Sequence, residues 1–150
     1  MALGIITTEL ASSFRSAMES AGIEFVVENK VPEDILVWAD QDKWDKIVFN
    51  LLSNAFKFTT KGRVRVTSSA DNYYFYLEVQ DSGVGIPANE LSSIFERFVR
   101  VENNQARSIE GSGIGLSLTL ELVKAHGGKI GVDSVLHKGT TFKLKIPLGN

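Results

Sequence analysis

The segment from Asp42 to Phe58 constrains the fold of this chain more than any other stretch. Its large apolar residues recur at intervals of three and four, the spacing of one buried helix face. They are Trp44, Ile47, Val48, Leu51, Leu52 and Ala55. The pattern therefore predicts a long helix that packs against a core.

Three polar residues lie beside that apolar arc. Asn50, Asn54 and Lys57 are spaced i, i+4 and i+7, so they fall within roughly 60° of one another on a helix. Asparagine is a poor helix former, and two in the middle of a helix require a reason. One reason is a magnesium and phosphate site, because amide oxygens suit Mg²⁺ and a lysine neutralises phosphate. A solvated stripe at the core margin is the alternative, and this helix alone does not decide between them.

The rest of the chain predicts strands and two further main helices, without repeats or low-complexity segments. Helices on one face of a mostly antiparallel sheet would satisfy this order within a single domain, residues 1–150. The expected helices span about 8–20, 88–95 (a short one) and 114–126. The expected strands are 23–27, 35–38, one around Val64 and Val66, one around 74–79, 129–134 and 140–146, the last two as a hairpin.

Two glycine-rich loops are candidate ligand sites. The first runs from Asp81 to Pro87, where Gly83 and Gly85 permit positive φ and a close approach of the backbone to a ligand. Asp81 offers a fixed acceptor suited to the exocyclic amine of a base. A simple Asp-Gly turn explains this loop equally well.

The second loop, from Glu110 to Leu116, opens a predicted helix, and free N–H groups at a helix start favour phosphate. It matches neither a Walker P-loop nor the dinucleotide fingerprint. The polar segment between Val99 and Glu110 carries Arg100 and Arg107 and has the character of a lid. A disordered surface loop is the competing interpretation.

Composition narrows the classes of function. The formal net charge of −2 disfavours a general nucleic-acid binder, and the absence of cysteine removes disulfides and thiolate metal sites. No apolar run approaches the ~20 residues that cross a bilayer, so we expect no membrane contact by this fragment and a cytoplasmic location.

Taken together and in order, five segments resemble the motifs of the catalytic ATP-binding domain of sensor histidine kinases. That family belongs to a wider ATP-binding superfamily with gyrase, MutL and a heat-shock chaperone. The segments resemble the asparagine box, the first glycine box, the phenylalanine box, the second glycine box and the closing Gly-Thr motif: residues 50–59, 81–86, 95–98, 111–116 and 138–142. The resemblance spans nearly the whole chain. It implies a two-layer α+β sandwich in which three helices cover one face of a mixed sheet, with an ATP lid between the phenylalanine box and the second glycine box.

The resemblance also implies the role of each residue around Mg–ATP. Asn50 and Asn54 would hold Mg²⁺, and Lys57 would contact phosphate. Asp81 would accept a hydrogen bond from the adenine amine, and Thr141 would lie behind the base near Asp81. The remaining implied nucleotide contacts are Phe58 and Ile86 lining the base pocket, Gly83 and Gly85 folding the loop against the nucleotide, Phe98, Arg100 approaching the γ-phosphate, and Gly111, Gly113, Gly115 and Leu116 at the phosphates.

The position of Asn50 separates a kinase from an ATPase. Hydrolysing relatives carry a glutamate there as general base, and an amide cannot accept that proton. The domain is therefore expected to position ATP for another nucleophile. A serine kinase of the anti-sigma type and a non-catalytic nucleotide sensor are the alternatives; Asn50 disfavours the former, and the complete set of boxes the latter.

The phosphoacceptor is expected on another domain. His126 and His137 are the only histidines, and neither has the neighbours of a phosphoacceptor box; His126 is expected to cap or pack at a helix end, and His137 to lie in a turn. The implied partners are a dimerisation domain bearing the phosphoacceptor histidine and a response regulator receiver domain. The fragment is expected to be monomeric and the whole kinase, simple or hybrid, a homodimer.

Overall fold

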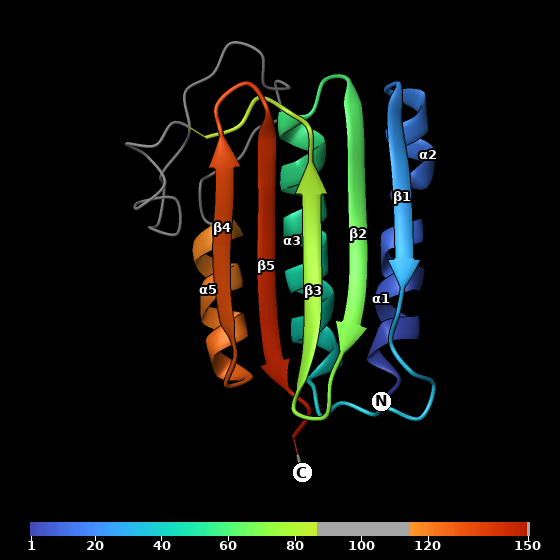
Figure 1. Cartoon of the computed structure of the whole chain (residues 1–150), viewed down its shortest axis with the longest axis vertical. Coiled ribbons are helices and arrows are strands. Elements are labelled where there is room, and N and C mark those ends of the chain that lie inside the picture. The colour runs from blue at the N-terminus through green and yellow to red at the C-terminus, as the bar shows by residue number, and fades with distance from the viewer. Residues whose placement is uncertain (87–114, 150) are drawn as a thin grey trace.

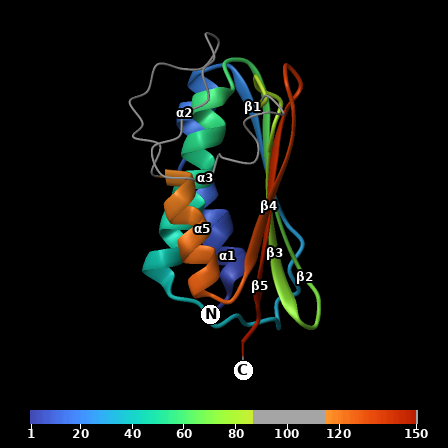
Figure 2. The ribbon, with the colours of Figure 1, turned by 90° about the vertical axis from the view of Figure 1, so that its left-hand side faces the viewer.

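The computed structural model describes residues 1–86 and 115–149, which form one sheet with helices packed on one of its faces (Figures 1 and 2). The five strands lie in the order β1-β2-β3-β5-β4, with β1 and β2 parallel and every other neighbouring pair antiparallel. Their bounds are β1 (Ile23–Asn29), β2 (Gly62–Ala70), β3 (Tyr74–Asp81), β4 (Lys129–Val135) and β5 (Gly139–Pro147). This mixed sheet with one covered face confirms the expected α+β fold.

The helical layer consists, within the described residues, of α1 (Leu3–Ser12), α2 (Arg15–Ser20), α3 (Gln41–Phe58) and α5 (Gly115–Ala125). Helix α3 begins at Asp40, whose side chain accepts the Lys43 N–H at 3.0 Å. Its predicted apolar face is buried in full. Trp44 packs edge-on against Phe75 of β3, with 5.5 Å between ring centroids, and its indole N–H donates to Thr7 at 2.9 Å.

The alternation of side chains along the strands explains why only one face of the sheet is covered. In β3, Phe75, Leu77 and Val79 are buried against the helices, whereas the residues between them reach the open face. Ion pairs between neighbouring strands cross that open face, such as Arg63–Glu24 at 3.0 Å. The covered face of the sheet therefore carries the core, and the open face is solvated.

Two predicted elements differ from the structure. The helix expected over 8–20 starts earlier, at Leu3, and is broken at residues 13–14 into α1 and α2; the Ser13 hydroxyl there bonds back to the Leu10 carbonyl at 2.6 Å. The strand expected over 35–38 is wrong. This segment bonds to the chain ends instead of a strand, through Val37 with Met1 and Trp38 with Leu148. The short helix predicted for 88–95 and the lid lie outside the described residues.

Candidate functional site

The first glycine loop is wedged between the end of α3 and the turn that joins β4 to β5. At Gly83, a Cβ atom would lie 2.2 Å from the carbonyl oxygen of Phe58, the last residue of α3. The next residue, Val84, donates its N–H to the same carbonyl at 3.1 Å. Only glycine allows the two backbones to approach so closely. The loop is therefore fixed to the helix that carries Asn50, Asn54 and Lys57, which we call the asparagine stripe.

The other side of the loop contacts the β4–β5 turn. Gly85 has φ of +74°, and a Cβ atom there would lie 2.2 Å from the Val135 carbonyl oxygen. The His137 N–H donates to the Val84 carbonyl at 2.6 Å. Both glycines are thus required by packing within the protein. Their predicted role at the nucleotide stays a prediction.

Asp81, the last residue of strand β3, is buried, with 5% of the residue exposed. Burial raises its pKa to about 6, although the backbone N–H groups of Gly83 and Thr140 donate to it and oppose that rise. The Gly83 bond measures 2.9 Å. These two donors, counted among residues 1–86 and 115–149, fill about half of the roughly four acceptor positions of a carboxylate. The site therefore holds a desolvated acceptor with capacity for a further donor.

The predicted place of Thr141 beside Asp81 is wrong by one residue. Thr141 pairs with Gln80, so its side chain lies on the open face of the sheet. Thr140 pairs with Asp81 and is buried at 6% exposure on the same face. The period of two places Thr140 on the face of buried Phe142, and this signal was available in the sequence.

The asparagine stripe lies on the helix that the sequence predicts. Asn50, Asn54 and Lys57 are half-buried residues of α3, on one face and in the C-terminal half of the helix. The Lys57 ammonium lies 5.5 Å from the centroid of the Phe58 ring. The end of α3, the end of β3 and the β4–β5 turn all lie at one end of the molecule (Figure 1). The structure thus brings the stripe and the first glycine loop to the same end.

Part of the predicted phosphate site lies outside the described residues, namely Phe98, Arg100, Gly111 and Gly113. Gly115 is the first residue of α5, and the half-buried Leu116 packs against the core. Helix α5 packs beside α3 and runs in the opposite direction, so its N-terminus is directed toward the same end of the molecule as the glycine loop (Figures 1 and 2). That direction is the one that a phosphate-binding helix start requires.

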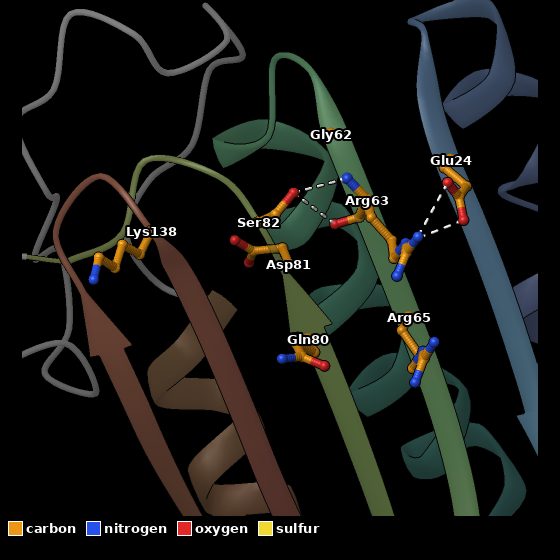
Figure 3. Close-up of a pocket in the computed structure, with 8 residues that line it drawn as sticks. All are labelled: Glu24, Gly62, Arg63, Arg65, Gln80, Asp81, Ser82 and Lys138. Atoms are coloured by element: carbon orange, nitrogen blue, oxygen red, sulfur yellow. Dashed lines mark hydrogen bonds and ion pairs between the residues drawn. The ribbon is translucent and has the colours of Figure 1, made fainter.

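A separate groove of about 500 Å³ lies on the open face of the sheet, beside the end of β3. Figure 3 shows Asp81 there pointing away from the Arg63–Glu24 pair, and Ser82 bonded to the backbone of Arg63. The groove is lined by Glu24, Gly62, Arg63, Arg65, Gln80, Asp81, Ser82 and Lys138. Both arginines of the groove are partly exposed and paired with glutamates, so the groove is a solvated surface next to the site.

Both histidines of the chain lie at structural positions, one at a helix end and one in a turn. The His126 ring accepts the Asp40 N–H through Nε2 at 3.1 Å and lies 2.8 Å from the Leu122 carbonyl through Nδ1. A carbonyl can only accept and an N–H can only donate, so the proton is on Nδ1 and both nitrogens are engaged. This confirms that His126 packs at a helix end and ties α5 to the start of α3. His137 lies in the β4–β5 turn as predicted, with φ of +68°.

Within residues 1–86 and 115–149, no helix combines the length and apolar character needed to cross a bilayer. Likewise, no group of three or more His, Asp or Glu side chains there could enclose a metal ion.

Comparison with known families gives the assignment. The sequence matches the family described as histidine kinase-, DNA gyrase B-, and HSP90-like ATPase over residues 39–150. The chain belongs to this family. The matched range contains the asparagine stripe, both glycine loops and the β4–β5 hairpin, so the family includes all the segments that carry the candidate site.

Similar proteins within this ATPase family are sensor histidine kinases. The autoinducer 2 sensor kinase/phosphatase LuxQ of Vibrio vulnificus is 37% identical over 145 residues, covering 93% of this chain and 17% of LuxQ. The sensor histidine kinase WalK of Bacillus subtilis is 39% identical over 129 residues, covering 83% of this chain and 21% of WalK. The chain thus spans about a fifth of the length of these relatives.

Solved structures agree with this grouping. The nucleotide-free catalytic domain of histidine kinase ThkA superposes with a TM-score of 0.83 at 27% identity, covering 99% of this chain and 96% of that one. Full-length ShkA in complex with AMPPNP gives 0.83 at 27% identity, covering 100% and 31%. ThkA in complex with the response regulator TrrA gives 0.78 at 25%, covering 99% and 41%. The chain therefore has the fold of a histidine kinase catalytic domain.

Proposed function

We propose that this chain binds Mg–ATP and presents the γ-phosphate to a histidine on a separate dimerisation domain in two-component signalling. The observation that carries the proposal is the buried Asp81 carboxylate, held by backbone N–H groups at the end of the molecule where α3 and the glycine loop meet. A desolvated acceptor with spare lone pairs suits the exocyclic amine of adenine. The AMPPNP complex of the similar kinase ShkA supports a nucleotide at this fold.

The residues present fit a magnesium nucleotide. Asn50 and Asn54 would offer amide oxygens to Mg²⁺, and Lys57 would neutralise phosphate charge from the same helix face. Phe58 follows Lys57 at the end of α3, and its carbonyl contacts Gly83 of the loop that begins at Asp81. This contact supports a base site that adjoins the phosphate site. The metal would supply charge neutralisation at the β- and γ-phosphates. Arg100 and the second glycine loop complete the proposed phosphate site.

The chain itself supplies no general base at the Asn50 position, which favours phosphoryl transfer over hydrolysis. The lone pair of His126 Nε2 accepts a backbone N–H, which disfavours it as a nucleophile. The acceptor histidine would belong to a dimerisation domain of the whole kinase. The receiver domain of a response regulator is the proposed second partner, supported by the ThkA–TrrA complex.

The test is an ATP titration by calorimetry with and without Mg²⁺, on wild type, Asn54→Ala and the control Ser53→Ala, a neighbouring residue of α3 outside the stripe. We expect Asn54→Ala to lose about tenfold in affinity with Mg²⁺, since a contact to a charged group is removed, and Ser53→Ala to match wild type. Mixing wild type with a histidine-bearing helical hairpin and labelled ATP should label only the hairpin. Absence of ATP binding by wild type, or stable label on His126, would contradict the proposal.

A further inference from the structure

Ser134, at the end of β4, connects the glycine loop to the β4–β5 hairpin through one hydroxyl group. Its Oγ lies 2.7 Å from the Ile86 N–H nitrogen, 2.9 Å from the Gly139 carbonyl oxygen and 2.8 Å from the Thr140 hydroxyl. Ser134 belongs to none of the five boxes of the sequence. Its three partners nevertheless lie in the first glycine loop or beside Asp81.

The donors and acceptors of this cluster follow from chemistry. A serine hydroxyl has one proton and two lone pairs. The Ile86 N–H can only donate and the Gly139 carbonyl can only accept, so they use one lone pair and the proton. The Thr140 hydroxyl must then donate to the second lone pair. Ser134 is therefore saturated, and the Thr140 oxygen keeps its own lone pairs as acceptors on the face of the sheet that carries Asp81.

The same hairpin tip fixes Asp81 by direct contact. A Cβ atom at Gly139 would lie 2.1 Å from the Asp81 carbonyl oxygen, and the Thr140 N–H donates to the Asp81 carboxylate. The backbone N–H of His137 also binds the loop, at the Val84 carbonyl. The loop and the carboxylate are thus both attached to residues 134–140. The Ser134 side chain bonds to the loop at Ile86 and to Thr140, whose backbone N–H donates to the Asp81 carboxylate.

We propose that Ser134 is a positioning residue of the nucleotide site, which fixes Ile86 and Thr140 relative to Asp81 and so sets the affinity and selectivity for the base. This inference rests on the proposed function, since it concerns the same site. Removing the hydroxyl leaves the buried Ile86 N–H without its acceptor and frees the Thr140 hydroxyl to rotate. Both changes reduce affinity, because a site that is already ordered loses less conformational entropy when it binds a ligand.

The experiment compares Ser134→Ala with Ser68→Ala in the whole chain. Ser68 is a buried serine of β2, at the other end of the sheet, so its variant controls for the loss of a buried hydroxyl. Calorimetry measures the dissociation constants for ATP, ADP and GTP, and thermal unfolding measures stability. We expect Ser134→Ala to bind ATP and ADP about tenfold more weakly than wild type, with the same loss for both nucleotides. The variant should also discriminate less between ATP and GTP. Ser134→Thr, which keeps the hydroxyl, should restore affinity, and Ser68→Ala should match wild type in affinity.

Each outcome of this experiment either supports or overturns the proposed role of Ser134. Wild-type affinity in Ser134→Ala would overturn the inference while leaving ATP binding intact, and so would an equal loss of affinity in Ser68→Ala, which would indicate general destabilisation. If wild type binds no adenine nucleotide, the proposed function fails and this inference fails with it. If Ser134→Ala does not fold, Thr140→Val replaces it: reduced ATP affinity supports the cluster, and unchanged affinity overturns it.

Discussion

Strand β3 has an aspartate near each of its ends, and the two carboxylates are in opposite situations. Asp71 precedes the strand in an exposed turn, where it accepts the N–H groups of Tyr73 and Tyr74 at 2.8 Å each and the Tyr76 hydroxyl at 2.6 Å. The Tyr76 hydroxyl, with those N–H groups, lowers the pKa of Asp71 below its ordinary value. This carboxylate stabilises the β2–β3 turn, because neighbouring donors bind it while it stays exposed to water.

Asp81, at the other end, is stabilised less well. Burial raises its pKa to about 6, and its two backbone donors do not offset the loss of water. Folding has therefore placed a carboxylate where its charged form is costly, and no cation in the described part of the chain lowers its pKa.

The difference between the two ends distinguishes structure from function. Where local donors and water satisfy a carboxylate, it stabilises the fold. Where water is removed and acceptor positions remain, the cost is recovered only when a ligand supplies the missing donor. We therefore expect Asp81 to act as such a ligand acceptor and Asp71 to have no part in binding.

The largest expected effect is on ATP binding by Asp81→Asn. A neutral amide accepts a weaker hydrogen bond than a carboxylate and orients one NH₂ group toward donors, so we expect about a hundredfold loss of affinity. Calorimetry of wild type and variant at pH 7.5 measures it. An unchanged affinity, or equal affinity of wild type for GTP, would show that Asp81 does not recognise the base.

The second effect is on the pH dependence of stability without nucleotide. The folded pKa of Asp81, about 6, is above the ordinary 3.8. Its contribution to stability is therefore fully present below about pH 4 and is lost as pH rises through 6. We expect this loss to be about 2–3 kcal/mol. Urea unfolding of wild type and Asp81→Asn between pH 4 and 8 isolates the group. As pH rises, the free energy of unfolding of Asp81→Asn should increase relative to that of wild type. Parallel curves of unfolding free energy against pH would contradict the burial of the Asp81 charge.

Much of the fold was predictable because periodicity reports burial. The long helix was predicted within a residue, and the β4–β5 hairpin was found, since Trp44 and Phe142 belong to clear helical and alternating patterns. The segment 35–38 is a short apolar run of the kind that buried strands have, yet it bonds to Met1 and Leu148 instead of to a strand. Whether an extended segment has a neighbouring strand depends on tertiary structure, and no local pattern contains that information.

The candidate site was predictable only in part. The motifs identify Asp81 and the asparagine stripe, but they place Thr141 where the register requires Thr140. Ser134 could not be found, because a serine near the end of a strand is ordinary in sequence. Its importance comes from a backbone N–H 48 residues away along the chain. The requirement for glycine at 83 likewise arises from the Phe58 carbonyl, a contact that only the folded chain reveals.

The smallest expected effect, and the sharpest control of the comparison, is at Asp71. Asp71→Asn should leave ATP affinity unchanged, because the turn lies at the opposite end of β3 from Asp81 (Figure 1). Its contribution to stability has the opposite sign of pH dependence: it is present above pH 3.8 and is lost as pH falls through the lowered pKa. Tyr76→Phe removes the main cause of that lowering, so NMR titration should find the Asp71 pKa raised toward its ordinary value. An unchanged Asp71 pKa would show that the tyrosine bond does not persist in solution, and a change in ATP affinity would show that the two ends of the strand are coupled.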